Sequence, residues 1–112
     1  EDTVLSNLVL LMKMLCVEEP PISKVLEAGI VPVLCYILTS EAHDENAMLE
    51  ATWCCTNLCV GSSAEVRLVT PVVPILVAHL SGHHPVLREQ ALSCLGIVYN
   101  RFSSPMLNVI VN

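Results

Sequence analysis

The sequence predicts an all-α protein of the helical-repeat class. Apolar residues recur three and four positions apart through most of the chain, which is typical of helices that pack one face on a core. Glycine or proline lies near the expected ends of most of these helices. A short helix, a buried helix and a long helix follow in the same order twice, with a period of about 41 residues. These observations predict a solenoid with about two full three-helix repeats and partial repeats at both ends.

Each helix is predicted from its own residues. Gly29 follows a short apolar stretch in the position of a left-handed helix cap, and Pro32 lies in the first turn of the next helix, where proline is tolerated. Residues 103–105, Ser-Ser-Pro, are expected to end the last long helix. The helices predicted in this way cover residues 4–16, 22–28, 31–38, 46–60, 64–69, 72–80, 85–100 and 106–112.

Equivalent positions define the repeat. They lie 40 residues apart in the long helices, 41 in the short ones and 42 in the buried ones: Ala51 with Ala91, Cys54 with Cys94, Val25 with Val66, and Leu38 with Leu80. A period near 41 with three helices per unit lies in the range of HEAT and armadillo arrays. The positions expected in the core between successive repeats are Ala51, Cys54, Leu58, Ala91, Cys94 and Leu95.

The repeat predicts the domain organisation. We expect the third helix of a preceding partial repeat over 1–16, two repeats over 20–62 and 63–103, and the start of a following repeat over 104–112. Hydrophobic residues make up 54% of the chain, a high fraction that suits a segment excised from a longer array, because terminal repeats lose their covering neighbours.

Charge and cysteine usage narrow the functional classes. The net charge of −6 argues against a nucleic-acid surface, which needs clustered Lys and Arg, and leaves a basic peptide as a permitted partner. Apolar stretches are broken by Lys13 or by prolines, so no signal peptide or membrane-spanning helix is expected within this segment. The six cysteines lie in or at the end of helical apolar patterns and are expected to be free, small buried side chains in a reducing, intracellular compartment.

The helix over 46–60 carries two different faces. Its apolar side is expected in the core, whereas Glu50, Trp53, Asn57 and Gly61 follow one another at spacings of three and four on the other side. Trp53 offers a ring on which a Lys or Arg stem can lie, and Asn57 offers a donor and an acceptor for a peptide backbone. This pattern predicts a peptide-binding surface. The alternative is that Trp53 packs on a neighbouring helix and Asn57 faces water.

At this point the residues resemble armadillo repeats of the importin-α type. The resemblance rests on EPPISKVLEAGIVPVL, EATWCCTNLCVGSS and REQALSCLG, and it extends from about Leu11 to Asn100. It implies a right-handed armadillo solenoid, an adaptor whose concave groove holds a lysine-rich nuclear localisation signal in extended form. The residues that match the family's groove positions are Trp53, Asn57 and Gly61, followed by Gln90 in the next repeat.

The chain departs from the family pattern one repeat later. Ser93 replaces the second tryptophan, Ile97 replaces the second asparagine, and Arg101 replaces an aspartate that meets the key lysine. Each lost contact costs about 1–3 kcal/mol, and Arg101 repels a cation. The sequence therefore predicts that the solenoid is kept while a lysine-rich signal is no longer the cargo in the family's main register.

Other clusters predict no chemistry. Cys55 and Cys59 are four apart on a helix, but no paired C-x-x-C or H-x-x-x-H accompanies them, so no zinc site or cofactor is expected. The histidines considered as further ligands are His43, His79, His83 and His84. His83 and His84 are expected in a solvated turn, because no nucleophile motif accompanies a general base. The acids Glu41, Asp44 and Glu45 form either an extended acidic rim or a solvated loop.

The prediction is a non-enzymatic protein–protein interaction scaffold, an importin-α-like armadillo domain that presents a concave groove to an extended peptide in the cytoplasm or nucleus. The alternative is a degenerate structural module of a longer protein, with or without a membrane-associated part, that has no peptide-binding groove. A thiol or metal enzyme is disfavoured. The orientation of Trp53 and Asn57 distinguishes the peptide-binding scaffold from the structural module. A thiol or metal enzyme would require Cys and His side chains that converge on one site.

Overall fold

The fold is a stack of helices. The computed structural model describes residues 2–16, 21–40 and 44–111, with side chains described for 3–16, 21–40 and 44–102. These residues form helices and turns and contain no strand. The elements are α1 (Asp2–Leu15), α2 (Ile22–Glu27), α3 (Ile30–Thr39), α4 (Glu45–Leu58), α5 (Ser63–Val69), the 3₁₀ helix η1 (Thr70–Val72), α6 (Val73–His79) and α7 (Pro85–Val111).

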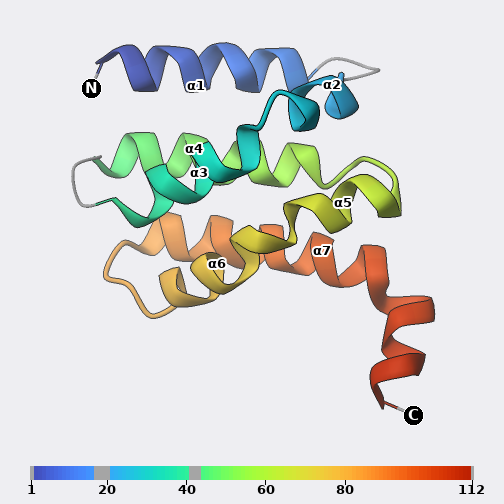
Figure 1. The fold of residues 1–112 in the computed structure, drawn as a ribbon. Helices are drawn as coiled ribbons and strands as arrows, with labels where there is room; N and C mark the ends of the chain where they lie inside the picture. Colours follow the sequence, from blue (N-terminus) through green and yellow to red (C-terminus); the bar gives the residue numbers. More distant parts are fainter. Residues whose placement is uncertain (1, 17–20, 41–43, 112) are drawn as a thin grey trace.

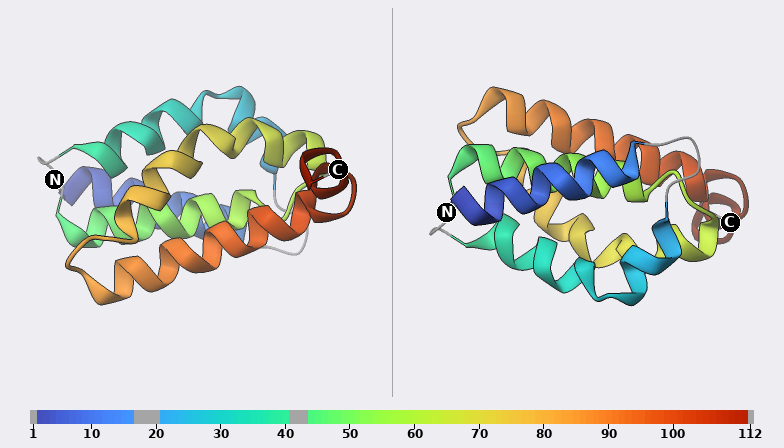
Figure 2. Two further views of the ribbon diagram at one scale, coloured as in Figure 1. Left: turned by 90° about the horizontal axis from the view of Figure 1, so that it is seen from below. Right: turned by 90° about the horizontal axis from the view of Figure 1, so that it is seen from above.

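The long helices form one layer and the short helices form another. Helices α1, α4 and α7 lie side by side and run in the same direction, with α4 in the middle (Figure 1). The two views of Figure 2 show α2, α3, α5 and α6 on one side of this layer. The unit α2–α3–α4 is therefore followed by the similar unit α5–α6–α7, and the all-α repeat architecture is confirmed.

Local residues explain where the helices begin. Gly29 has φ of 84° before α3, a left-handed conformation that glycine adopts without a Cβ clash. Asp44 caps α4, because its Oδ1 accepts a hydrogen bond from the backbone N–H of Ala47 at 2.9 Å. Ser62 and Glu65 form a capping box at the start of α5. The predicted cap at Gly29 is confirmed.

The core lies between the two layers. Five of the six positions predicted to be shared between repeats have no exposed side-chain surface: Ala51, Cys54, Leu58, Ala91 and Cys94. Leu95 is partly buried against the same cluster. The period deduced from the sequence is confirmed by these positions, because a shift of one residue would turn them about 100° away from the core.

Two predictions about local structure are wrong. The long helix does not end at residues 103–105, because α7 continues to Val111 and its ribbon changes direction in the last part (Figure 1). A proline such as Pro105 removes one backbone hydrogen bond and bends a helix, but it does not always end it. Cys16 is exposed rather than buried, because it lies one residue beyond the end of α1.

The other cysteines follow the prediction more closely. All six are free thiols, and Cys54, Cys55, Cys59 and Cys94 are buried while Cys35 is partly buried. Within the described ranges, no helix is both long and apolar enough to cross a membrane.

Candidate peptide-binding face

Helix α4 occupies the central position of the long-helix layer. Its buried side packs on the short helices, and Glu50, Trp53 and Asn57 are partly exposed on its other side, as is Gly61 just beyond its end. Trp53 is the single tryptophan of the chain. The exposed fraction of these side chains is intermediate, so each is partly packed against the protein and partly accessible to solvent. This position between α1 and α7 gives any ligand at Trp53 neighbours on two sides.

The Asn57 side chain is held in place by two contacts. Its Nδ2 donates a hydrogen bond to the Trp53 carbonyl at 3.0 Å and lies 3.2 Å from Sδ of Met12 in α1. Both hydrogens of the amide are thereby directed at atoms of the chain itself. The remaining polar atom, Oδ1, is the one suited to accept a hydrogen bond from a peptide N–H. The alternative in which Asn57 simply faces water does not describe this geometry.

Glu50 brings negative charge to the same side of α4. Its Oε2 is buried and has no hydrogen-bond partner among the described residues. Burial, followed by the negative charge of Glu50, raises the pKa of the Cys54 thiol to about 12. Cys54 itself lies 3.8 Å, Sγ to carbonyl oxygen, from Leu8 in α1. The negative charge of Glu50 favours a positively charged group on this side of α4.

Helix α7 carries the residues that were predicted to depart from the family pattern. Gln90 and Ile97 are partly exposed, and Ser93 and Arg101 are exposed. Arg101 Nη2 donates a hydrogen bond to the Val60 carbonyl at 3.3 Å, so its guanidinium lies at the C-terminal end of α4. Sequence spacing alone did not predict this contact, which joins residues 41 positions apart.

Helix α1 carries two residues that the sequence reasoning did not consider. Leu10 and Met14 are 58% and 50% exposed. They lie 43 residues before Trp53 and Asn57, respectively. We call the exposed side of the long-helix layer the third-helix face, and its members are Leu10, Met14, Trp53, Asn57, Ser93 and Ile97. An alignment of α1 with α4 would have predicted that Leu10 and Met14 belong to this face.

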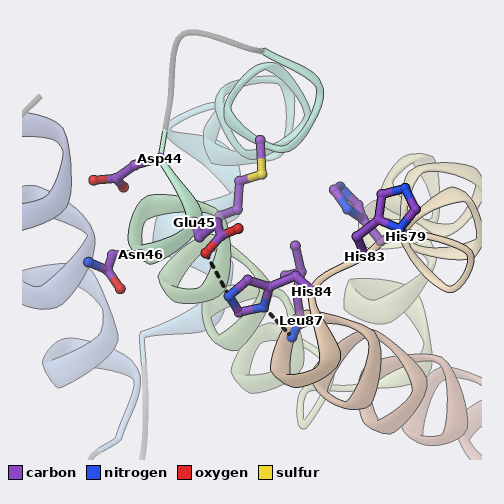
Figure 3. A pocket seen from close by; sticks show the side chains of 9 residues that line it. Asp44, Glu45, Asn46, His79, His83, His84 and Leu87 are labelled. Carbon is purple, nitrogen blue, oxygen red and sulfur yellow. Dashed lines mark hydrogen bonds and ion pairs between the residues drawn. The ribbon is translucent and has the colours of Figure 1, made fainter.

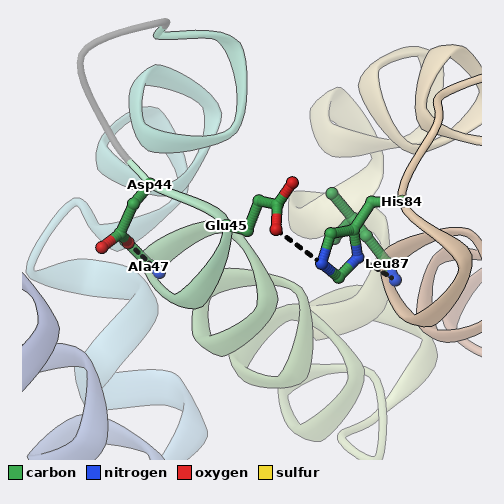
Figure 4. Close-up of polar contacts among 5 residues, drawn as sticks. All are labelled: Asp44, Glu45, Ala47, His84 and Leu87. Atoms are coloured by element: carbon green, nitrogen blue, oxygen red, sulfur yellow. Dashed lines mark hydrogen bonds and ion pairs between the residues drawn. The ribbon is translucent and has the colours of Figure 1, made fainter.

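A second candidate region lies at the edge where α4 and α7 begin. An open cavity of about 560 Å³ is lined by side chains from α4, α6 and the turn before α7: Asp44, Glu45, Asn46, Met48, His79, His83, His84 and Leu87, with Gly82 (Figure 3). Glu45 and His84 point toward one another, with 2.9 Å between Oε2 and Nε2. The Leu87 N–H donates to His84 Nδ1 at 3.1 Å (Figure 4).

These contacts correct the prediction that His84 is a solvated turn residue. Its side chain caps α7 and pairs with Glu45, so both ring nitrogens are occupied and neither is available to a metal ion or a substrate. His79 is also engaged, with Nε2 2.9 Å from the Leu38 carbonyl. No three His, Cys, Asp or Glu side chains in the described part of the chain are arranged to hold a metal ion. His43 and Glu41 lie outside the described residues.

The stacked three-helix units and their central α4 define an armadillo-type helical-repeat protein. No protein-family model matches the chain. The chain is 38% identical to Importin subunit alpha-2 of Arabidopsis thaliana over 77% of its length, 40% identical to Importin subunit alpha-9 of the same plant over 56%, and 34% identical to Importin subunit alpha-B of Dictyostelium discoideum over 80%. The chain therefore belongs to the importin-α-like armadillo-repeat family. It spans 16%, 12% and 18% of these relatives' own lengths.

Proposed function

We propose that this chain is a non-enzymatic armadillo scaffold whose third-helix face binds an extended segment of a partner protein. The observation that carries the proposal is the pair Trp53 and Asn57, one helical turn apart and partly exposed at the centre of that face. The importin-α relatives support the same class of function. The proposed repeats cover 20–62 and 63–103, with partial repeats over 1–16 and 104–112.

The proposed binding chemistry uses three side chains of α4. The Trp53 ring supports the aliphatic stem of a ligand Lys or Arg. Asn57, oriented by its bonds to Trp53 and Met12, accepts a hydrogen bond from the ligand backbone through Oδ1. Glu50 lies one turn before Trp53 and adds a negative charge that attracts a basic side chain.

Binding of a lysine-rich nuclear signal along the whole face is not proposed. Ser93 supplies no aromatic surface, the Ile97 side chain supplies no hydrogen bond, and the exposed Arg101 adds repulsion. The discriminating variant combines Ser93→Trp, Ile97→Asn and Arg101→Asp. Tight binding of a lysine-rich peptide by this variant, but not by the natural chain, would support a face derived from a nuclear-signal site.

The proposal is tested by titration with a library of labelled extended peptides. Trp53→Ala with Asn57→Ala should weaken binding by about 1–3 kcal/mol, whereas Leu92→Ala, which shortens an exposed apolar side chain on α7, should leave it unchanged. No binding by the natural chain, with its helical circular dichroism intact, would favour the structural module instead. The contact between Asn57 and Met12 supports that alternative, because it also serves helix packing.

We further propose a reducing intracellular compartment, the cytoplasm or the nucleus. The six free thiols support this proposal, since oxidising compartments favour disulfides.

A further inference from the structure

The alignment of α1 with α4 defines which residues of α1 form the edge of the third-helix face beside Trp53. Leu8 is 4% exposed and Ala51 is fully buried, and these residues are 43 positions apart. Leu15 and Leu58 are likewise buried and 43 positions apart. The two helices are parallel neighbours (Figure 1). Both buried pairs support a register in which equivalent positions on α1 and α4 are 43 residues apart.

In this register, Leu10 takes the position of Trp53 and Met14 takes the position of Asn57. Both side chains of α1 are at least half exposed, so the side of the layer beside Trp53 is apolar. Neither side chain can clamp a peptide backbone or attract a charge. An apolar side chain of a ligand, by contrast, would lose water-exposed area against them.

The other end of the face carries a fixed positive charge. The exposed Arg101 is tied to the carbonyl of Val60. Val60 lies two residues beyond the end of α4 and seven residues after Trp53, which places it about 10 Å further along the direction of the helix. Val60 is itself 55% exposed, so this end is open to a ligand. A cation in this place repels lysine and attracts a carboxylate.

We propose that the third-helix face selects an extended segment with an apolar side chain over Leu10 and Met14, a basic side chain at Trp53, and an acidic side chain at Arg101. The proposal rests on the proposed function and deepens it, because it replaces a lysine-rich ligand with one of mixed character. The complementarity is apolar against apolar, cation against Glu50 and Trp53, and anion against Arg101.

The geometry of packed helices sets the spacing in such a ligand. Axes of neighbouring helices lie about 8–10 Å apart, and an extended chain advances about 3.3 Å per residue. Successive contacts are therefore about three residues apart. The probe is a capped peptide with leucine at position 1, arginine at position 4, glutamate at position 7 and serine at the other positions. One variant has serine in place of leucine, and another has lysine in place of glutamate. Each peptide is also made with its sequence reversed.

Binding is measured by fluorescence anisotropy of the labelled peptides at about 0.15 M salt, where the net charge of −6 is largely screened. The leucine–arginine–glutamate peptide should bind tightest in one chain direction. Replacing its glutamate by lysine should weaken binding by about two- to fivefold, as expected of an exposed ion pair. Replacing its leucine by serine should have an effect of about fivefold.

Charge reversal at Arg101 gives the sharpest comparison. Arg101→Glu should reverse the preference, so that the lysine peptide binds better than the glutamate peptide. Arg88→Glu is the matched control, because Arg88 is also exposed on α7 and also donates to a backbone carbonyl, that of Gly82 at 2.9 Å. Its reversal should leave the preference for glutamate in place. Equal effects of the two reversals would overturn the assignment of Arg101.

The apolar end is tested separately. Leu10→Ser with Met14→Ser should abolish the discrimination between leucine and serine peptides, whereas Leu92→Ser on the outer side of α7 should preserve it. If Trp53→Ala weakens all the peptides but neither exchange in the ligand matters, the mixed ligand is wrong and the proposed function stands. If the natural chain binds none of the peptides, both are overturned.

Discussion

Single residues show how burial changes the chemistry of this chain. Burial and the neighbouring negative charge of Glu50 raise the pKa of Cys54, and burial raises the pKa of Cys55 well above its usual value. A hydrogen bond with Cys94, together with burial, raises the pKa of Cys59. Thiolates are the reactive form of cysteine, so these three thiols are expected to be inert in the folded protein. Cys16, in contrast, is exposed.

The thiols provide the first prediction. Iodoacetamide at about pH 8 should modify Cys16 first in the native protein and leave Cys54 and Cys55 unmodified, because both are buried and their raised pKa values leave almost no thiolate. Mass spectrometry of the digested protein measures the modification at each site. In denaturant without reductant all six should react. Fewer than six additions, or native modification of Cys54 as fast as Cys16, would contradict the prediction.

Single elements depend on their caps. Helix α5 has seven residues and begins with a capping box, in which the Glu65 N–H donates to Ser62 Oγ at 3.2 Å and the Ser62 N–H donates to Glu65 Oε1 at 2.8 Å. A helix this short is not stable without tertiary contacts and satisfied terminal N–H groups. At the start of α7, the Leu87 N–H is satisfied in a similar way by the Nδ1 atom of His84.

The capping box provides the second prediction. Ser62→Ala should lower the free energy of unfolding by about 1 kcal/mol, because the Glu65 N–H loses its acceptor. Urea denaturation followed by circular dichroism measures the change. Ser63→Ala is the matched control, since Ser63 is exposed and already inside the helix, and it should change the free energy of unfolding by less than about 0.5 kcal/mol. Equal changes in both variants would show that the cap does not stabilise α5.

The whole molecule is held by contacts between the two three-helix units as well as by its core. Four polar contacts of this kind in the described part of the chain join residues about one repeat apart, and they are Ser23 with Glu65, Leu38 with His79, Glu45 with His84, and Val60 with Arg101. Hydrogen bonds from Ser23 and from the Ser62 backbone lower the pKa of Glu65, burial opposes them, and a hydrogen bond with the Ser62 side chain adds to the lowering. Ionised Glu65 therefore stabilises the stacking of α2 on α5.

The lowered pKa provides the third prediction. A carboxylate whose pKa is lower in the folded state stabilises it above the unfolded pKa, about 4.3, and this stabilisation is lost as the pH falls through the folded value. Glu65→Gln should therefore reduce the loss of unfolding free energy below about pH 4.3 relative to the natural chain. Urea titrations at a series of pH values measure it. Glu89→Gln, an exposed acid of α7, serves as control, and an identical effect of both variants would refute a special role for Glu65.

Most of the helices and their period follow from local chemistry, so the sequence was sufficient for them, whereas the end of α7 was predicted too early. Apolar residues at three- and four-residue spacing define which side of a helix is buried, and this predicted the burial of Ala51, Cys54 and Cys94. A left-handed cap needs glycine, and Gly29 was identified on that ground. For the candidate site, the sequence predicted only that Trp53 and Asn57 lie on the same side of one helix. This too follows from helical periodicity.

Periodicity does not say which side chains of two different helices meet, because that depends on the distance and offset between their axes. Only the packed structure brings Asn57 to Met12, and Arg101 to Val60. It likewise pairs His84 with Glu45 on another helix, whereas the cap that His84 makes to the Leu87 N–H is a local contact. The local sequence pattern determined which side of each helix is buried. The contacts between side chains of different helices were decided by long-range packing.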